Sequence, residues 1–456
     1  MNKNIRSSNP ATQGGVESSR FGRFLNGIFG FEENGTNLKT EVIAGLTTFV
    51  TMAYLVAVVP GMLSSAGVPF GAALTVTVVM SALSSLAMGL YTNRPFALAP
   101  GLGSVAIFSY TLLGGGVPLS IAAGIVFISG LLFMLVSFLG IREFIVKIIP
   151  RGVKVSVGVG IGLFIALLGF KQSGITVADA SKNVLVFGDL ASTEVLVSFF
   201  GFLLVLFFSA RKIQGGIILA IAITTLISLL LGITSVPENF FALPGSISEL
   251  SFKLDVFGAL NPAYLPFLLA FFIPDFFSTL GTLLGVGAQG GYLDKDGNLP
   301  GIDKNFHVDS TATTFGALFS APVLTTYVES ASGVAAGGRT GLTAVVVGVC
   351  FSLTLFMAPL ASMIPTVATA PVLMYIGITM MSSMSKIDYD DMTEYLPAFV
   401  CVIVSVFSFN AGNGIAAAML IYAFLKVVTG RYKEDHWSVY VIAVGMIYYF
   451  YIVTAS

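Results

Sequence analysis

The sequence predicts an all-α polytopic membrane protein with about 14 transmembrane segments, arranged as two inverted repeats of seven spans. The chain has 456 residues, is 55 % hydrophobic and only 10 % charged. Its mean hydropathy is +0.92, and a water-soluble fold of this length could not bury so much apolar surface. Apolar stretches of spanning length recur between polar or Gly/Pro breaks, and with this span count nearly all of the basic residues fall on one side of the membrane, as the positive-inside rule requires.

The apolar stretches are, in chain order, about 42–59, 71–91, 97–113, 119–140, 153–170, 194–209, 215–232, 264–287, 308–322, 328–340, 342–360, 366–384, 396–409 and 412–428. A fifteenth stretch, 437–454, begins with the only tryptophan and contains several tyrosines. It either spans the membrane or lies at its interface.

Basic residues predict the orientation. With the N-terminus in the cytoplasm, 19 of the 22 lysines and arginines fall on the cytoplasmic side, and only Lys171, Lys182 and Lys253 fall outside. We therefore expect a multi-pass protein of a cell inner membrane, in contact with the lipid bilayer, with a cytoplasmic N-terminus. The net charge of −1 gives no support for a nucleic-acid partner.

Two halves of seven spans start from opposite sides of the membrane, which makes them inverted repeats. The third span opens with PFALAPGLGSVAIF (Pro95–Phe108), and the tenth with APVLTTYVESASGV (Ala321–Val334). Each has a proline, a short extended stretch and then small residues. Paired interrupted spans place a substrate site between them at the midplane. The alternative is that Gly and Pro are simply frequent in membrane helices.

Glu329 is the carboxylate that points most directly to a site. It lies in TTYVESASGVAAGGRTGLT, residues 325–343, within an apolar part of the chain. An acid at the centre of a membrane helix costs roughly 2.5–3.5 kcal/mol, and the glycines predict a short or broken helix whose freed backbone faces a cavity. Pairing with Arg339 is the alternative, but ten residues of helix would separate the two by about 15 Å. We expect Glu329 to bind a substrate N–H and a proton.

Two other acids have different expected roles. Asp275 follows Pro274 at the start of the eighth span, where it either caps the helix or binds substrate together with Ser278 and Thr282 on the same face. Glu41 opens the first span and is interpreted as a helix-start or interface residue.

Catalytic chemistry is not expected. Intramembrane hydrolysis needs a Ser/His pair, paired aspartates or a metal-binding histidine cluster. His307 and His436 fall in predicted cytoplasmic loops, and the sequence gives Asp275 no evident second intramembrane aspartate. Cys350 and Cys401 lack metal-ligand spacing. The sequence therefore predicts no enzyme, no metal site and no cofactor.

Several motifs together resemble the nucleobase permeases of the nucleobase–ascorbate transporter superfamily, in particular the AzgA-like hypoxanthine/adenine/guanine branch. They are NGTNLKTEVIAGLTTFVTMAYLVAVVP (Asn34–Pro60), ALAPGLG (Ala97–Gly103), STLGTLLGV (Ser278–Val286) and the segment around Glu329. The resemblance covers about residues 30 to 430. It implies a core domain of spans 1–4 and 8–11, a gate domain of spans 5–7 and 12–14, short strands opening spans 3 and 10, and a substrate between these strands and span 8.

The implied boundaries are a cytoplasmic segment 1–40, core 41–140, gate 141–263, core 264–365, gate 366–430 and a tail 431–456 with an additional hydrophobic segment. The resemblance also carries over to residues. Glu329 matches the glutamate that hydrogen-bonds ring N–H groups, and Asp275 the first acid of the eighth-span motif. The second acid of that motif is Ser278 here, and the usual asparagine of the third span is Val105.

The resulting prediction is a secondary active transporter that imports a purine nucleobase or purine-like heterocycle, coupled to protons or another ion, with a homodimer left open. The substrate-binding residues are predicted to be Glu329, Ser278, Asp275, Thr282, Tyr327, Val328, Ser330, Gly103, Ser104, Val105, Thr48 and Phe49, and Glu329 is also expected to carry the proton. A facilitator, or a transporter of another small solute such as a non-purine heterocycle or an anion, is the alternative on the same fold; Glu329 argues against an anion.

Overall fold

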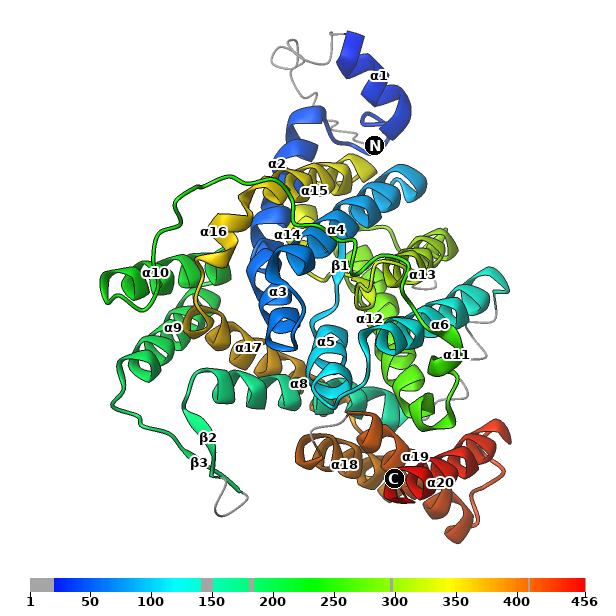
Figure 1. Cartoon of the computed structure of the whole chain (residues 1–456). Helices are drawn as coiled ribbons and strands as arrows, with labels where there is room; N and C mark the ends of the chain where they lie inside the picture. The colour runs from blue at the N-terminus through cyan, green and yellow to red at the C-terminus, as the bar shows by residue number, and fades with distance from the viewer. Residues whose placement is uncertain (1–19, 141–150, 180–183, 296–297, 409–410, 456) are drawn as a thin grey trace, which may run out of the picture.

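The computed structural model describes residues 20–140, 151–179, 184–295, 298–408 and 411–455, and it is mostly helical (Figure 1). The elements of the first half are α1 Arg20–Phe29, α2 Leu38–Met52, α3 Leu55–Ser65, α4 Phe70–Thr92, β1 Leu98–Pro100, α5 Leu102–Ala106, η1 Ile107–Leu113, α6 Leu119–Phe138, α8 Arg151–Gln172, β2 Thr176–Asp179, β3 Val184–Phe187, α9 Thr193–Ala210 and α10 Gly216–Leu230. Those of the second half are α11 Val256–Ala259, η2 Pro262–Tyr264, α12 Leu265–Gly290, α13 Ile302–Ala317, β4 Leu324–Thr326, α14 Ser330–Ala335, α15 Gly341–Thr354, η3 Leu355–Met357, α16 Ala358–Ser362, α17 Thr366–Met380, η4 Met381–Lys386, α18 Met392–Phe407, α19 Ala411–Val428 and α20 Ser438–Ala455.

Seven helices of the described chain are long and apolar enough to cross a membrane, and six further apolar helices are shorter. The first predicted span is confirmed, because Leu38–Ser65 is one candidate span, in which the regular helix is interrupted between Met52 and Leu55. Two predicted spans differ from the structure. The ninth is α13, which starts six residues earlier than predicted and contains more polar and charged residues than the predicted stretch 308–322. The tenth is half strand and half helix, so α14 is only 6 residues long.

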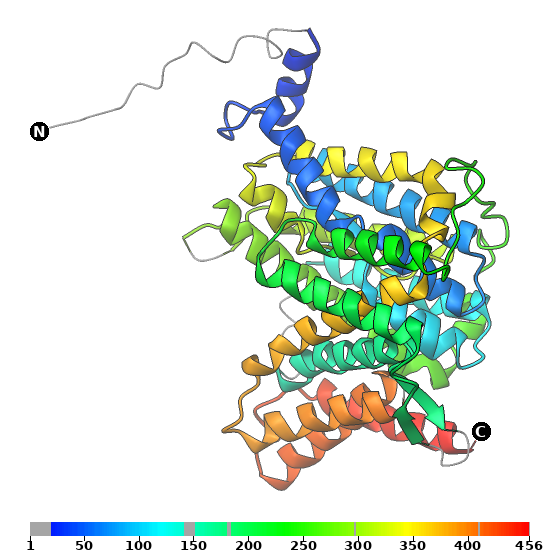
Figure 2. The same cartoon turned by 90° about the vertical axis from the view of Figure 1, so that its left-hand side faces the viewer.

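Helix contacts fall into two groups. In one, α4 packs against α15 and α13, α15 against α2, and α13 against α6; in the other, α8 packs against α17 and α18, α9 against α10 and α17, and α18 against α19. Figure 2 shows these helices stacked, with α15 near one end of the stack and α18 and α19 near the other. The predicted limits of the core and gate domains stay a prediction. Helix α12 contacts both groups, because it packs on α6 and also on α8 and α19.

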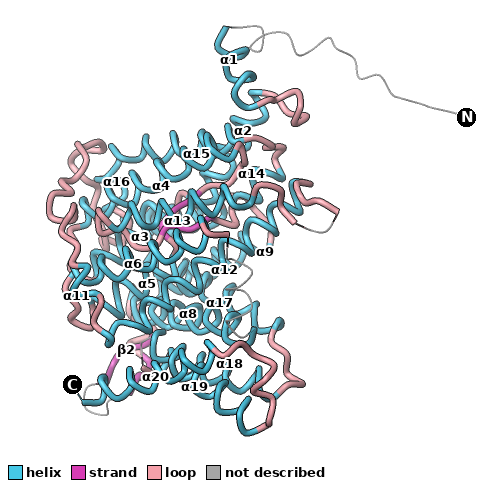
Figure 3. Tube along the Cα trace, turned by 90° about the vertical axis from the view of Figure 1, so that its right-hand side faces the viewer, coloured by secondary structure: helices cyan, strands magenta, loops and turns pink. Residues whose placement is uncertain are grey.

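A pair of three-residue strands lies inside the helical layers (Figure 3). β1 and β4 pair antiparallel, with Leu98 opposite Thr326 and Pro100 opposite Leu324. This confirms the predicted strands at the start of spans 3 and 10. A second antiparallel strand pair, β2–β3, was not predicted; it lies in the connection between α8 and α9, and β3 (VLVF) is apolar throughout, without the alternation that marks a half-buried strand.

Close packing of α4 against α15 depends on two glycines. A Cβ atom on Gly341 would lie 1.8 Å from the Gly89 carbonyl oxygen, and one on Gly89 would lie 2.4 Å from the Gly341 carbonyl oxygen. Glu41 holds the same end of α15: its Oε1 accepts the Arg339 amide at 2.7 Å and its Oε2 accepts the Thr343 hydroxyl at 2.6 Å. Glu41 is fully buried there, in the first turn of α2, so its expected helix-start position is confirmed and its contacts fasten α2 to α15.

The C-terminal segment is fastened to the α18–α19 end of the molecule by ion pairs. Arg431 pairs with Asp391 at 2.8 Å and with Glu434 at 2.9 Å, and Lys426 pairs with Glu434 at 2.8 Å. The hydrogen bonds from Arg431 and Lys426 lower the pKa of Glu434 to about 2. Beyond this network α20 packs on α19 and also contacts η2 and α12, so the fifteenth apolar stretch is a helix packed against the spans.

The glycine contact generates a prediction about stability. Gly341→Ala should destabilise the protein by about 1–3 kcal/mol, because a methyl group in this contact forces the α4 and α15 backbones apart. Gly61→Ala is the matched control, since a Cβ at this α3 position meets nothing within 4 Å. Thermal unfolding of the detergent-solubilised protein checks both variants, and equal midpoints for Gly341→Ala and Gly61→Ala would contradict the packing argument.

Candidate functional site

The carboxyl group of Glu329 lies at the junction between β4 and α14, where span 10 changes from strand to helix. Tyr54 lies at the corresponding break of span 1, between α2 and α3, and its hydroxyl donates to Glu329 Oε1 at 3.0 Å. One turn away, the Thr51 and Ser332 hydroxyls are 3.1 Å apart. The two chain breaks are therefore joined by side-chain hydrogen bonds, and one acceptor oxygen of Glu329 is oriented by Tyr54.

The backbone around Glu329 is held by the strand pair. The Tyr327 amide donates to the Ala97 carbonyl at 2.9 Å, and the Tyr327 hydroxyl donates to the Pro100 carbonyl at 2.6 Å. The Ala97 amide donates to Ser330 Oγ at 3.0 Å. On the other side, the Ser104 hydroxyl donates to the Gly101 carbonyl at 2.7 Å. Backbone groups freed by the interrupted helices are thus paired inside the protein, as a membrane interior requires.

Close to this junction the structure has an open face. Val328, next to Glu329, is 62 % exposed. On α12, Ser278, Gly281 and Gly285 are exposed, and a Cβ on either glycine would meet nothing within 4 Å. Their spacing of three and four residues places them on one side of the helix. Helix α12 also contacts α14, so a small, weakly polar helix face runs beside the buried strands. We call Ser278, Gly281, Gly285 and Val328 the open face.

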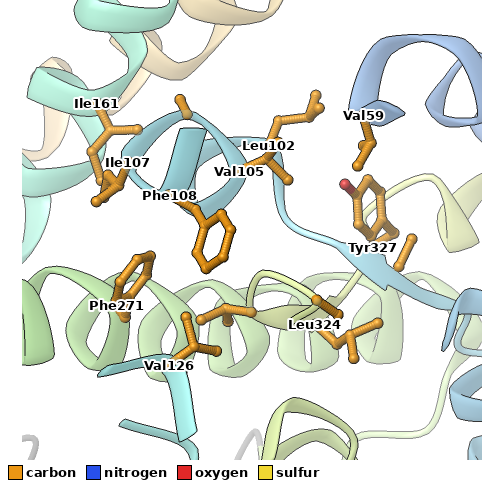
Figure 4. Packing of buried hydrophobic residues seen from close by; sticks show 14 of the residues in the cluster. Val59, Leu102, Val105, Ile107, Phe108, Val126, Ile161, Phe271, Leu324 and Tyr327 are labelled. Atoms are coloured by element: carbon orange, nitrogen blue, oxygen red, sulfur yellow. The ribbon is translucent and has the colours of Figure 1, made fainter. Parts of the chain in front are cut away.

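The predicted site residues divide between the open face and the scaffold. Ser278 and Val328 are exposed, and Glu329, Gly103, Ser104 and Phe49 are half-buried. Buried in the scaffold are Thr48, Val105, Asp275, Thr282, Tyr327 and Ser330. Figure 4 shows Val105 and Phe108 among apolar neighbours, with Phe108 directed towards Phe271. Phe49 packs edge to face on Phe351 of α15, with ring centroids 5.4 Å apart.

Asp275 has a carboxylate neighbour that the sequence analysis missed. Asp309 of α13 is fully buried and interacts electrostatically with Asp275, which is 5 % exposed. The expectation that Asp275 has no second intramembrane aspartate beside it is therefore wrong. Residue 309 lies within the predicted ninth span, where it was counted as part of an apolar stretch. The expected loop position of His307 is also wrong, since His307 lies in α13 and stacks on Phe138 with centroids 4.1 Å apart.

Other residues of the site had weaker signals. Tyr54 was missed because no Gly or Pro marks the break after Met52. Gly281 and Gly285 were detectable as a pair of small residues one turn apart beside Ser278. The tight packing of α14 on α2 explains another glycine: a Cβ on Gly333 would lie 2.2 Å from Thr48 Oγ1. Thr48 of α2 therefore packs directly against the backbone of α14 at Gly333.

Comparison with known proteins now gives the family. The family model Xan_ur_permease, described as the Permease family, matches residues 39–430. The chain belongs to this Permease family. A putative permease of Methanocaldococcus jannaschii, MJ0326, is 47 % identical over 92 % of the chain and 97 % of its own length. The adenine permease AdeQ of Escherichia coli is 36 % identical over 92 % and 94 %. The guanine/hypoxanthine permease PbuO of Bacillus subtilis is 36 % identical over 91 % and 98 %.

Solved structures show the same fold at low sequence identity. The transmembrane domain of the cyanobacterial bicarbonate transporter BicA has a TM-score of 0.60 at 18 % identity, covering 84 % of this chain and 97 % of that domain. The SLC26A9 structure has a TM-score of 0.61 at 12 % identity, covering 91 % and 70 %. These structures show the inverted-repeat fold, and membership of the Permease family makes the chain a multi-pass membrane transporter rather than an enzyme.

The division between open face and scaffold predicts opposite tolerances for the same introduced side chain. Val105→Asn should destabilise the protein by about 1–3 kcal/mol, because it buries an amide without partners where Val105 is fully buried. Ser278→Asn, on the open face, should change the stability by less than about 0.5 kcal/mol. Thermal unfolding in detergent measures both, and a Val105→Asn protein as stable as Ser278→Asn would contradict the assignment of Val105 to the scaffold.

Proposed function

We propose that this permease imports a purine nucleobase or a closely similar planar heterocycle across a cell inner membrane, by alternating access and coupled to protons. The observation that carries the proposal is the position of Glu329. Its carboxyl group is an oriented hydrogen-bond acceptor at the strand–helix junction, next to an open face of small residues. The names of the curated relatives, which include adenine and guanine/hypoxanthine permeases, support the substrate class.

Recognition follows from the chemistry of the base. A purine ring presents N–H groups along its edge, and a carboxylate accepts such groups in charge-assisted hydrogen bonds. The Tyr54 hydroxyl already donates to one oxygen of Glu329 at 3.0 Å, which leaves the carboxylate acceptor capacity for a ligand. Gly281 and Gly285 leave room above α12 for a flat ring, and the Val328 side chain supplies an apolar contact. Ser278 supplies a neutral hydroxyl.

The contacts of α12 support alternating access as the mechanism. This helix carries the open face and packs both on α6 and on α8 and α19, so it lies where the two groups of helices meet. Gly103 of α5 also meets this boundary, because a Cβ there would lie 2.9 Å from Ile161 of α8. Movement of the α8-containing group against the strand pair would open the site to either side. The distribution of basic residues supports a cytoplasmic N-terminus.

An anion is the second candidate substrate, because the solved relatives of this fold include a bicarbonate transporter. A carboxylate at the site repels an anion, whereas it attracts a base that offers N–H groups. No lysine or arginine side chain of the described residues is hydrogen-bonded to Glu329. The anion hypothesis is therefore the weaker one, and a competition assay separates the two.

Uptake of radiolabelled adenine, guanine and hypoxanthine tests the proposal. Cells that lack their own purine permeases should accumulate at least one of these bases when they express the chain, and unlabelled purines should compete while bicarbonate and sulfate do not. The same cells with empty vector are the control. If no nucleobase accumulates and none competes, the nucleobase function is rejected.

Glu329→Gln tests whether the carboxyl group of Glu329 accepts the hydrogen bonds of the base. The amide keeps the size of the side chain but loses the charge that strengthens the hydrogen bonds, which is worth about 1.5–3 kcal/mol. The apparent affinity for the base should fall by about tenfold to a hundredfold with normal membrane insertion. Glu238→Gln, the same change at an exposed residue between α10 and α11, is the control that should behave as the native protein. Unchanged affinity in Glu329→Gln would show that Glu329 is not the central ligand.

A further inference from the structure

Asp275 and Asp309 form a buried carboxyl pair behind the strand β4, between α12 and α13. The two groups differ in their hydrogen bonds. Asp309 Oδ2 accepts the Thr279 hydroxyl at 2.6 Å, the Thr326 hydroxyl at 2.8 Å and the Thr326 amide at 3.1 Å. Three donors around one oxygen are the surroundings of an ionised carboxylate.

Asp275 has fewer and weaker donors, the Thr313 and Thr325 hydroxyls. The Thr313 hydroxyl lies 3.4 Å from Asp275 Oδ2, but the same hydroxyl donates to the Leu324 carbonyl at 2.8 Å. The second oxygens of both acids, Asp275 Oδ1 and Asp309 Oδ1, are buried without any hydrogen-bond partner. An ionised Asp275 would therefore be poorly stabilised, whereas a protonated Asp275 carries only a neutral polar group into the same place.

No basic side chain compensates the pair. Across the described ranges, neither acid forms an ion pair. The ionisable groups on the elements packed against α12 and α13 have other contacts or are exposed. Glu329 binds Tyr54, Tyr327 binds Pro100, His307 lies against Ser137 and Phe138, Lys426 pairs with Glu434, Tyr422 binds Asp435, Tyr440 binds Tyr432, and Lys171, Asp303 and Lys304 are exposed.

Two carboxylates that share an apolar site cannot both ionise without a large energetic penalty. We propose that Asp275 and Asp309 hold one proton between them, carried by Asp275, and that this pair is the site of the coupling proton. The role in coupling rests on the proposed transport function; the shared proton does not. The sequence favours Glu329 for the proton, whereas the contacts favour Asp275, because Glu329 serves as an acceptor for the base.

Threonine hydroxyls connect the pair with the substrate side. Thr325 of β4 is half-buried, its hydroxyl lies 3.0 Å from the Thr279 hydroxyl, and it interacts with the Asp275 carboxyl. On release, the O–H bond of Asp275 breaks and the proton passes by way of Thr325 to water at the open face. The carboxylate left behind faces the charge of Asp309.

The position of the pair explains how a proton can affect access. Asp275 lies on the buried side of α12, and Ser278 on its open face is less than one turn away. Loss of the proton leaves two like charges between α12 and α13, which repel each other at the place where β4 is fastened by Thr313 and Asp309. A change in the protonation of Asp275 therefore acts directly on the helix and strand that form the substrate site.

Infrared titration of the purified, lipid-reconstituted protein tests the shared proton without any transport assay. The carbonyl stretch of a protonated carboxyl group should persist at neutral pH in the native protein and in Glu329→Gln, and it should be absent in Asp275→Asn. In Asp309→Asn the band should remain but disappear at lower pH than in the native protein, because the neighbouring charge is gone. A band that is lost in Glu329→Gln and kept in Asp275→Asn would overturn the proposal.

Proteoliposomes test the coupling. An inward proton gradient of about one pH unit supports about tenfold accumulation of a neutral base for a one-proton symporter. Asp275→Asn should reduce this ratio to about one, and Asp309→Asn should shift its pH profile downwards, which a purely structural role would not do. Tenfold accumulation by Asp275→Asn would contradict the coupling role. Failure of the native protein to transport any base would reject the proposed function, while the infrared titration would still report on the pair.

Discussion

The antiparallel contact between β1 and β4 is the interaction on which the rest of the structure depends. Each strand has only three residues, but together they pair the extended backbone of two interrupted spans in a membrane interior, where an unpaired amide or carbonyl costs several kcal/mol. Because the strand pair satisfies these backbone groups, spans 3 and 10 can each consist of a strand followed by a short helix. Glu329 lies at the strand–helix junction of span 10.

Much of the fold could be predicted, because lipid restricts what a sequence can do. Apolar stretches of spanning length in lipid form helices, which satisfy their own backbone hydrogen bonds. The prolines and small residues at Pro95–Phe108 and Ala321–Val334 marked the two interrupted spans. The break between α2 and α3 was not visible, because Met52 to Leu55 contains no helix breaker; tertiary contacts, among them the bond from Tyr54 to Glu329, select it. The ninth span was misplaced since α13 is polar and buried by protein instead of lipid.

The candidate site was predictable in its acids and less so in its geometry. Glu329 was recognisable from its cost in an apolar segment, and the structure adds Tyr54 as its donor. Asp275 and Ser278 were expected to act together on one face of α12, but the structure buries Asp275 and exposes Ser278, so of the two only Ser278 belongs to the open face. Val105 was expected beside the substrate and is fully buried. Asp309 could have been noticed as an acid within a predicted span, but only the packing of α13 on β4 and α12 reveals its partner.

The central claim is that a purine base occupies the space beside Val328, at the junction formed by the strand pair. The most direct test is chemical protection of a cysteine at that position. In a Cys350→Ala, Cys401→Ala background, Val328→Cys should react readily with a membrane-permeant maleimide, because the Val328 side chain is 62 % exposed. Adenine or hypoxanthine at saturating concentration should slow this reaction strongly, and bicarbonate should not. An alkylation rate that no nucleobase changes, in a variant that still transports, would contradict the account.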